Sequence, residues 1–285
     1  MSFSYEELAE IRYYIHQHPE LSGQEYQTTA FLKERLEELG IHVLESGLKT
    51  GLIAEIGSGQ PVVALRADID ALPIFEQTNL PYQSQNPGVM HACGHDFHQT
   101  SLLGAAALLK EKEDQLEGTV RLIFQPAEEI SEGASDVLAT GLLEDVQGII
   151  GFHNIPQLKA GQLALNAGAM MAGVEKFKVT VTGVSSHAAR PDLGVDTVTA
   201  ITTMVQNLQL LISRTVSPFE TAVLSITHLD VGSTWNVLPK SGYFEGTIRS
   251  FNPSVQRELK EHFVSIVRHI AKSLEVDVAF EWGVT

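Results

Sequence analysis

The spacing of hydrophobic residues in the first part of the chain predicts alternating helices and strands. Apolar residues recur at helical spacing in residues 5–17 and again in residues 25–39, where Gly40 is placed to end the second helix. Short apolar runs of the kind that form buried strands come later. We expect strands at residues 52–56, 62–68, 119–124 and 147–152, and helices at residues 96–112 and 134–139. This alternation predicts an α/β domain with a mostly parallel sheet and helices on both faces.

A different pattern begins near residue 173. Residues 175–182 read Glu-Lys-Phe-Lys-Val-Thr-Val-Thr, an alternation that predicts a half-exposed strand. The elements expected after it are a helix, two strands, a helix and a strand, at residues 195–214, 221–229, 243–251, 253–274 and 276–280. The order βαββαβ predicts a ferredoxin-like fold. We therefore expect two domains, residues 1–173 and 174–285, with the strand at 175–182 offering an edge for dimerisation.

Composition narrows the class of protein. The chain has 285 residues, 44% of them hydrophobic, which is enough for two domain cores. Its net charge of −16 argues against binding to nucleic acid or to an anionic membrane surface. No apolar run approaches the length of a membrane span, and the first residues lack the pattern of a secretion signal. The single cysteine, Cys93, cannot form an internal disulfide, so we expect a reducing, cytoplasmic location.

Residues of metal-binding types are concentrated in one stretch, His-Ala-Cys-Gly-His-Asp-Phe-His at residues 91–98. Gly94 allows the backbone to fold back, so the thiolate of Cys93 and the imidazole of His95 can reach one ion. His91 and His98 flank them. A histidine cluster in a loop is also compatible with ordinary polar surface, so this stretch alone leaves both interpretations open.

Three of the predicted strands are followed by polar residues. These residues are Asp68 and Asp70 at the carboxyl end of the second strand, Glu128 and Glu129 after the third, and His153 after the fourth. Ligands bind at the carboxyl ends of the strands in an open α/β sheet, so we expect these side chains to meet there. The alternative interpretation of the paired glutamates is an acidic helix start, which the helix dipole favours.

The motifs together resemble those of a known family. They are His91-Ala-Cys-Gly-His-Asp, Gln125-Pro-Ala-Glu-Glu, Gly151-Phe-His and Ser186-His-Ala-Ala-Arg-Pro, with Arg66-Ala-Asp-Ile-Asp-Ala-Leu-Pro and Asn236-Val-Leu-Pro. In this order they resemble the metal-dependent aminoacylase and carboxypeptidase family over nearly the whole chain. The branch they are most similar to includes hippurate hydrolase, N-acetyl-diaminopimelate deacetylase and the indole-acetyl-amino-acid hydrolases. The resemblance implies a two-metal catalytic domain with an inserted βαββαβ lid domain that dimerises.

The resemblance also implies roles for single residues. The residues that match the family's metal ligands are Cys93, His95, Glu129 and His153, and Glu128 matches its general base. Adjacent glutamates cannot easily point the same way from a strand end, so one can bind metal while the other holds the attacking water. A divalent ion lowers the pKa of bound water toward about 7. The thiolate favours zinc, whereas manganese, cobalt and nickel also suit such mixed sites. We expect two divalent ions.

Three residues of the second domain are candidates for contact with the substrate. His187 matches a histidine that, in the family, reaches a neighbouring subunit's site and stabilises the oxyanion. Asn236 resembles an amide that binds the substrate's carboxylate, and Arg249 is a further candidate for that anion. The alternative interpretation places His187 and Asn236 in ordinary turns.

Other polar residues are expected to support the metal ligands from behind or to cap helices. They are Asp68, Asp70, Asp96 and His98. Metal-bound histidines usually donate their other N–H to a carboxylate, which Asp68 or Asp70 can accept. His16 and His18 precede Pro-Glu at a helix end, and we interpret them as local helix caps.

The resemblance predicts a cytoplasmic, homodimeric enzyme that hydrolyses the amide bond of N-acyl amino acids such as N-acetyl amino acids. A dipeptidase or carboxypeptidase would use the same water and metals, and it is the first alternative. An inactive metal-binding dimerisation protein is the second. A hydrolase with a cysteine nucleophile is disfavoured, because the paired glutamates would then have no role.

The family's chain normally returns from the lid to the catalytic domain and supplies a late histidine ligand near a Gly-Glu-Asp-Phe-like stretch. No Gly-Glu-Asp-Phe occurs in this sequence. We therefore expect a C-terminally truncated form that lacks the return segment and is inactive or impaired.

Overall fold

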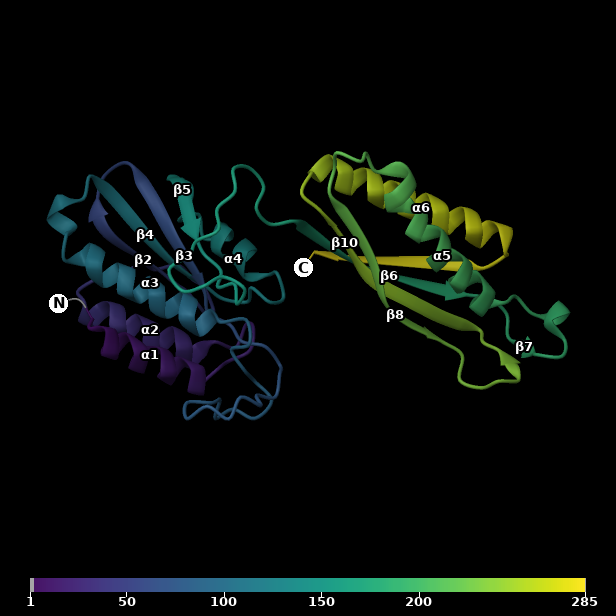
Figure 1. The fold of residues 1–285 in the computed structure, drawn as a ribbon, viewed down its shortest axis with the longest axis horizontal. Helices are drawn as coiled ribbons and strands as arrows, with labels where there is room; N and C mark the ends of the chain where they lie inside the picture. The colour runs from purple at the N-terminus through teal and green to yellow at the C-terminus, as the bar shows by residue number, and fades with distance from the viewer. Residues whose placement is uncertain (1–2, 285) are drawn as a thin grey trace. The chain divides into compact units, whose positions relative to one another are not determined.

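The computed structural model describes residues 3–284 and divides the chain into two compact units, Met1–Gln162 and Leu163–Thr285 (Figure 1). The boundary expected between residues 173 and 174 falls at the start of strand β6 (Gly173–Thr182), inside the second unit. No helix in the described part of the chain is long and apolar enough to cross a membrane.

The sheet of the first unit has five strands among the described residues, in the order β1-β2-β4-β3-β5. Their bounds are β1 His42–Val43, β2 Leu52–Ser58, β3 Val62–Asp68, β4 Gly118–Gln125 and β5 Val146–Gly151. β3 runs parallel to β4 and β5, whereas β2 runs antiparallel to β4 and β1. The α/β class is confirmed, and the expectation of a mostly parallel sheet is corrected to a mixed one.

The mixed sheet follows from one short connection. Residues 59–61 turn the chain between β2 and β3, so these two strands run in opposite directions. β4 then lies between them and must be parallel to one and antiparallel to the other. Local hydrophobic patterns predict that a strand forms but not which strand becomes its neighbour.

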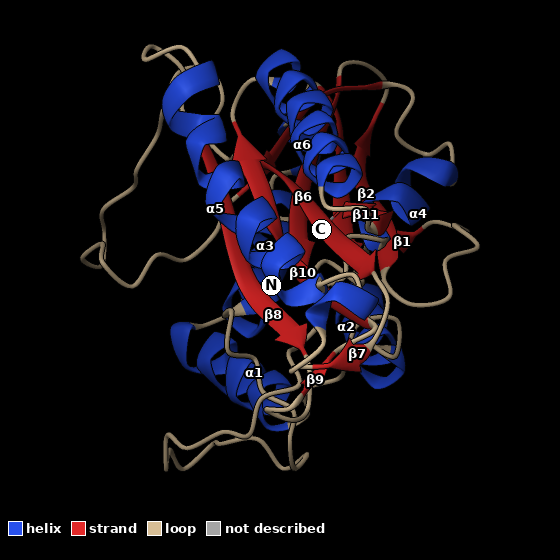
Figure 2. Ribbon diagram, turned by 90° about the vertical axis from the view of Figure 1, so that its right-hand side faces the viewer, coloured by secondary structure: helices blue, strands red, loops and turns tan. Residues whose placement is uncertain are grey.

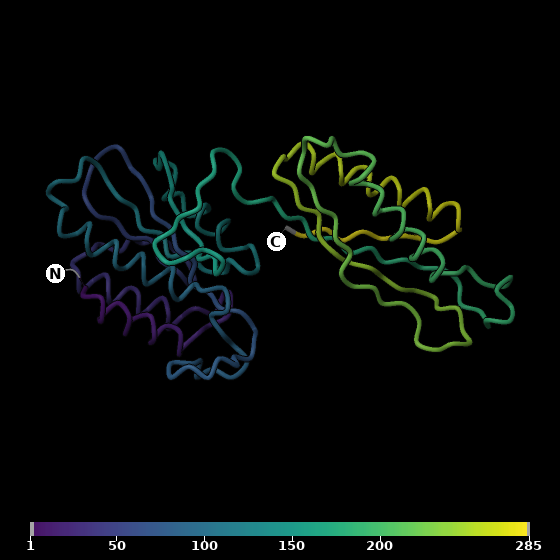
Figure 3. The backbone as a smooth tube through the Cα atoms, in the orientation of Figure 1, coloured from purple at the N-terminus to yellow at the C-terminus, as the bar shows by residue number. Residues whose placement is uncertain are grey.

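Helices cover both faces of this sheet, as predicted. They are α1 (Tyr5–Gln17), α2 (Tyr26–Glu38), α3 (His95–Lys110) and α4 (Gly133–Ala139), with the short 3-10 helix η1 at Glu113–Gln115. Neighbouring residues of β4 point to opposite faces, so Phe124 packs in the core beneath α2 and α3 while Ile123 packs in the smaller core beneath α4. Figure 1 shows α1, α2 and α3 together on one side of the strands. A long connection without helix or strand leads from β3 to α3 (Figure 3).

The second unit has the βαββαβ order predicted from the sequence. Its main elements are β6, α5 (Thr197–Thr215), β8 (Ala222–Val231), β10 (Ser241–Ser250), α6 (Pro253–Ser273) and β11 (Asp277–Val284). The strands pair antiparallel in the order β11-β6-β10-β8, and Figure 2 shows α5 and α6 in front of β6, β8 and β10. Phe177, Phe244 and Phe263 are fully buried between helices and sheet.

The strand predicted as a dimerisation edge is an internal strand. β6 pairs with β10 on one side and with β11 on the other, so its backbone groups are occupied. The edges of this sheet are β8 and β11. A smaller sheet pairs β7 (Ser186–His187) with β9 (Val237–Leu238), and the 3-10 helix η2 (Pro191–Leu193) follows β7.

Candidate metal centre

The turn that carries the cysteine is built on a glycine. Gly94 has a φ of +88° and is the N-cap of α3, so the backbone folds back between Cys93 and His95 as the sequence predicted. A Cβ at residue 94 would lie 2.5 Å from Oδ1 of Asn154, so a larger residue would also collide with the segment that follows β5. The turn therefore brings the first turn of α3 close to His153 and Asn154.

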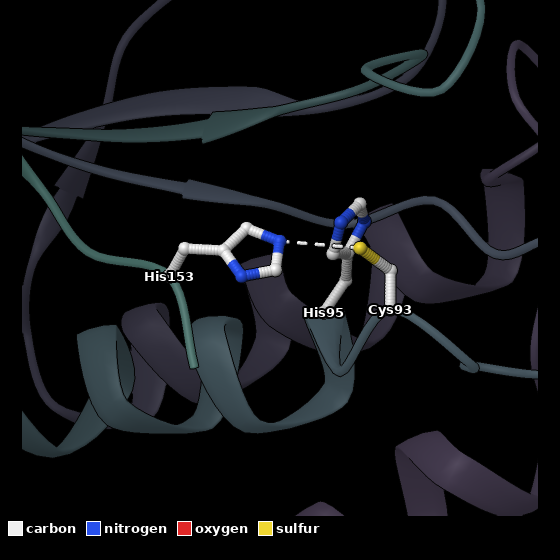
Figure 4. Close-up of side chains that lie close together, drawn as sticks. All are labelled: Cys93, His95 and His153. Carbon is white, nitrogen blue, oxygen red and sulfur yellow. Dashed lines mark hydrogen bonds between the residues drawn. The ribbon is translucent and has the colours of Figure 1, made fainter. Parts of the chain in front are cut away.

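Three sequence-predicted ligands meet at this turn. Sγ of Cys93 lies 3.1 Å from Nε2 of His153, and one ligand atom each from Cys93, His95 and His153 falls within 4.8 Å of the others. Figure 4 shows the ring of His153 pointing at the sulfur, with the ring of His95 beside it. A thiolate and two imidazoles are ligands of the kind that Zn²⁺ and similar ions prefer.

The paired glutamates lie on the other side of His95. Ligand atoms of His95, Glu128 and Glu129 also fall within 4.8 Å of one another. Nε2 of His95 lies 3.8 Å from Oε1 of Glu129, and both atoms are buried without a hydrogen-bond partner among the described residues. Burial also raises the pKa of Glu129, since the pocket disfavours its charge. Two buried polar atoms that face each other without hydrogen-bond partners, as Nε2 of His95 and Oε1 of Glu129 do, are suited to bind a cation between them.

Asp70 holds His95 in the orientation that this arrangement needs. Nδ1 of His95 lies 3.1 Å from Oδ1 of Asp70, which leaves Nε2 facing the glutamates. The second oxygen of Asp70 accepts hydrogen bonds from the backbone N–H of Glu129 at 2.9 Å and from Oγ of Ser22 at 2.7 Å. Burial by itself lowers the pKa of His95, but the bond to Asp70 and the contact with Cys93 outweigh it and raise the pKa to about 11. Metal binding at Nε2 would therefore displace a proton.

His98 and Asp68 form a second buried pair behind the ligands. Nδ1 of His98 lies 2.6 Å from Oδ1 of Asp68, and Nε2 accepts the backbone N–H of Asn154 at 3.0 Å. Arg66 donates to the other oxygen of Asp68 at 2.7 Å. Burial raises the pKa of Asp68, but the hydrogen bond from His98 and the nearby positive charges lower it to about 2. Because both ring nitrogens of His98 are engaged, this histidine orients the segment beside His153.

Asp96 and His16 serve a different part of the unit from the one predicted. Asp96 faces α1, where its carboxylate accepts hydrogen bonds from Arg12 at 2.9 Å and from Nδ1 of His16 at 3.0 Å. His16 is buried, and its Nε2 lies 3.2 Å from Glu76. The local-cap interpretation of His16 is therefore wrong. It holds for His18, whose Nδ1 contacts the carbonyl of Tyr14 at 2.7 Å.

A third candidate ligand group joins Asp68, His95 and His98, and His91 belongs to none of the three found among the described residues. It is buried, and burial lowers its pKa to about 4.

The spacing of Arg12 and His16, four residues apart on one helix, was the available signal for a buried ion-pair network around Asp96.

The His16 network makes a prediction about stability and pH. Burial by itself lowers the pKa of His16, but the hydrogen bonds and charges of Asp96 and Glu76 raise the pKa above its ordinary value. A pKa raised by folding contributes stability that is fully present below about pH 6.5 and is lost as pH rises through the folded-state pKa. Urea unfolding of wild type and His16→Gln should differ by about 1–3 kcal/mol at pH 6. This difference should shrink toward alkaline pH, and a difference that grows with pH would contradict the assignment.

The second unit brings His187 and Asn236 side by side. β7 and β9 pair His187 with Val237, and the backbone N–H of Ala188 donates to the carbonyl of Asn236 at 3.0 Å. The ring of His187 is exposed, and its Nδ1 accepts the N–H of Ala189 at 3.1 Å, which leaves Nε2 free to donate. The side chain of Asn236 accepts a hydrogen bond from Thr234 at 3.0 Å.

Arg249 is not close to this pair. It lies near the end of β10, eight residues after Ser241, which follows the turn from β9. Eight residues of strand span about 26 Å. Within one chain, Arg249 and Asn236 therefore cannot contact the same carboxylate.

Comparisons with known proteins agree with this geometry. The model of "Peptidase family M20/M25/M40" matches residues 64–282. The chain is 45% identical over 278 residues to an N-acetyl-L-cysteine deacetylase of Bacillus subtilis, covering 97% of this chain and 67% of that protein. It is 44% identical to an N-acetylcysteine deacetylase of the same organism, covering 96% and 73%. A crystal structure of a dinuclear metal-binding M20 peptidase from Bacillus subtilis superimposes with a TM-score of 0.82 at 42% identity, covering 97% and 73%.

Proposed function

Because the chain belongs to peptidase family M20/M25/M40, we propose that it hydrolyses N-acyl amino acids with a metal-activated water and Glu128 as general base. Membership of this family and the two deacetylase relatives make it a hydrolase of amide bonds. The N-acyl class is favoured because both relatives are named for an N-acetylated amino acid. The observation that carries the proposal is the unpartnered pair of buried atoms on His95 and Glu129 beside the Cys93 thiol.

The residues that would hold two divalent ions are Cys93, His95, Glu129 and His153, with Asp70 fixing the tautomer of His95. Two ions are supported by the dinuclear relative. When bound, such ions lower the pKa of a coordinated water and polarise the scissile carbonyl. Both glutamates are half-buried, and their proposed roles differ because Oε1 of Glu129 is the carboxylate oxygen that faces Nε2 of His95, at 3.8 Å.

Glu128 would take the proton from the attacking water and return it to the departing amine. A general base needs to lie within hydrogen-bond reach of that water, and the role is supported by the ligand atoms of His95, Glu128 and Glu129, which fall within 4.8 Å of one another. Protonating the nitrogen turns it into a neutral amine, which leaves as the carbonyl carbon keeps the new oxygen. The products are a carboxylic acid and a free amino acid.

The second unit would complete the site from a neighbouring subunit of a homodimer. Nε2 of His187 can donate a hydrogen bond to the developing oxyanion, and the amide of Asn236 can donate to the substrate's carboxylate. The sheet edges at β8 or β11 offer unpaired backbone groups for such a dimer. Analytical ultracentrifugation should give twice the chain mass.

Replacing His187 by alanine should lower kcat by about 10²–10³-fold, because a donor to the oxyanion is lost while the metal ligands are untouched. His269→Ala is the matched control, since His269 is exposed on α6 and its hydrogen bonds within the described chain go to Ser265 of its own helix. Metal content should be the same in both variants. Equal rates in the two variants would remove His187 from the reaction.

A peptidase that acts on free dipeptides is the second candidate, because the dinuclear relative is described as a peptidase. The two functions differ in whether the amine of the substrate's first residue is blocked. Rates on N-acetyl-L-cysteine, N-acetyl-L-methionine and hippurate should exceed those on the corresponding dipeptides with free amines. A clear preference for the dipeptides would favour the peptidase.

A further inference from the structure

Two buried carboxylates accept hydrogen bonds from the backbone on either side of Glu128. Asp70 accepts the N–H of Glu129 at 2.9 Å, and Glu25 accepts the N–H of Ala127 at 2.8 Å. Glu25 is separated from Ala127 by 102 residues of chain, so this contact is a tertiary one. The segment that presents the paired glutamates is thus held at both ends.

The carboxylate of Glu25 accepts two hydrogen bonds, one from the N–H of Ala127 and one from Thr50. Its side chain is completely buried, and its second oxygen accepts the hydroxyl of Thr50 at 2.7 Å. Although Glu25 is the N-cap residue of α2, its carboxylate makes no capping hydrogen bond there. Burying a carboxylate is costly unless it accepts hydrogen bonds. The position therefore requires both donors, Thr50 and Ala127.

Ala127 has a backbone conformation that a residue with a side chain rarely adopts. Its φ is +48°, and it is buried. Its carbonyl accepts the backbone N–H groups of Glu132 and Gly133 at 3.3 and 3.2 Å, while its N–H is bound by Glu25. Such strained residues persist where the surroundings hold them in place. The hydrogen bond to Glu25 restrains the backbone of Ala127 on its N–H side.

The turn that carries Thr50 also packs closely against this segment. Gly51 has a φ of +78°, and a Cβ there would lie 2.5 Å from Cδ of Pro126. Gly51 donates its N–H to Thr29 at 2.8 Å, which ties the turn to α2. The left-handed Ala127 is therefore surrounded by groups anchored to the start of α2.

We propose that Glu25 is a positioning residue for the hydrolysis, because its bond to the N–H of Ala127 sets the backbone from which Glu128 and Glu129 project. This inference rests on the proposed function of the same site. Glu25 lies behind the segment and acts only through it. Its loss should displace the general base and one metal ligand together.

The test compares Glu25→Gln with Glu25→Met, which have similar size but different hydrogen bonding. A glutamine can accept the Ala127 N–H with its oxygen and donate its NH₂ to Thr50, so kcat should stay within about threefold of wild type. Methionine can accept neither bond, and kcat should fall about 10²-fold with little change in KM, as expected when reacting groups shift by about 1 Å. The visible absorption bands of bound Co²⁺ should also change in Glu25→Met, because Glu129 moves relative to His95.

Thr50→Val is the matched control. It removes the other partner of Glu25 and leaves the bond to Ala127, so it should lower the Tm while keeping the Co²⁺ spectrum and kcat of wild type. Adding Ala127→Gly to Glu25→Met should restore part of the rate, because glycine accepts the left-handed conformation without strain. If Glu25→Met does not fold, Glu25→Asp replaces it, since a carboxylate one methylene shorter is drawn back from the Ala127 N–H that Glu25 accepts at 2.8 Å.

A wild-type spectrum and kcat in Glu25→Met, or in Glu25→Asp where that variant is used, would overturn the positioning role. A loss in Thr50→Val as large as that in Glu25→Met would overturn it as well, because the effect would then follow stability alone. A wild-type chain that binds no Co²⁺ and hydrolyses no amide would overturn the proposed function itself. Co²⁺ binding and amide hydrolysis by wild type are therefore measured before any variant is compared.

Discussion

Glu128→Gln is expected to lower kcat by about 10²–10⁴-fold and to leave the bound metal in place. The amide has the size of the carboxylate but cannot take a proton from the attacking water. Glu128 and Glu129 are both half-buried, but the unpartnered carboxylate oxygen that faces His95 belongs to Glu129. Steady-state rates on N-acetyl amino acids and metal analysis of the same samples measure the two effects.

The neighbouring residue provides the matched control for this prediction. Glu129→Gln changes the same group one position further along, and it should weaken metal binding as well as turnover. Opposite behaviour of the two variants, with metal lost in Glu128→Gln and kept in Glu129→Gln, would reverse the assigned roles. Full activity in Glu128→Gln would remove the general base from the account.

His95→Ala should abolish the stabilisation of the protein by divalent ions. His95 is shared by all three candidate ligand groups of the described chain, so its removal breaks each of them. A ligand at 1,000 times its Kd stabilises the folded state by about 4 kcal/mol. Wild type should therefore show a large rise in Tm with Zn²⁺, Mn²⁺ or Co²⁺, and the variant should show almost none.

His42→Ala is the control for the loss of a histidine, since His42 is exposed on β1 and belongs to no candidate ligand group. Its Tm should respond to metal as in wild type. The same metal-dependent rise in His95→Ala would mean that the ions bind elsewhere. Because His95 without metal carries a proton, the metal-dependent rise in wild type should also increase with pH.

Local sequence patterns were sufficient for the longer helices and strands and for the turn at Gly94, but not for the two-residue strands β1, β7 and β9. Gly94 between Cys93 and His95 indicated a fold-back, and the structure has it at a φ of +88°. The expectation that Asp68 or Asp70 accepts the second N–H of a ligand histidine agrees with the contact of Asp70 to His95. These features depend on neighbours in sequence or on general rules of metal coordination, so a local sequence pattern can predict them.

Contacts between distant segments were the part that the sequence could not give. Asp96 lies in the first turn of α3 next to His95, but its side chain is hydrogen-bonded to Arg12 and His16 on α1. Glu25 looked like an ordinary helix start, although its carboxylate binds Ala127. The neighbours of β4 and β6 in their sheets likewise depend on strand order, and no local periodicity encodes that order.

Anomalous diffraction from crystals of the full chain grown with Zn²⁺ tests the central claim most directly. The account predicts anomalous peaks about 2.0–2.3 Å from Sγ of Cys93, Nε2 of His95 and a carboxylate oxygen of Glu129. Peaks confined to other residues, with the Cys93 thiol and the His95 ring free of metal, would contradict it.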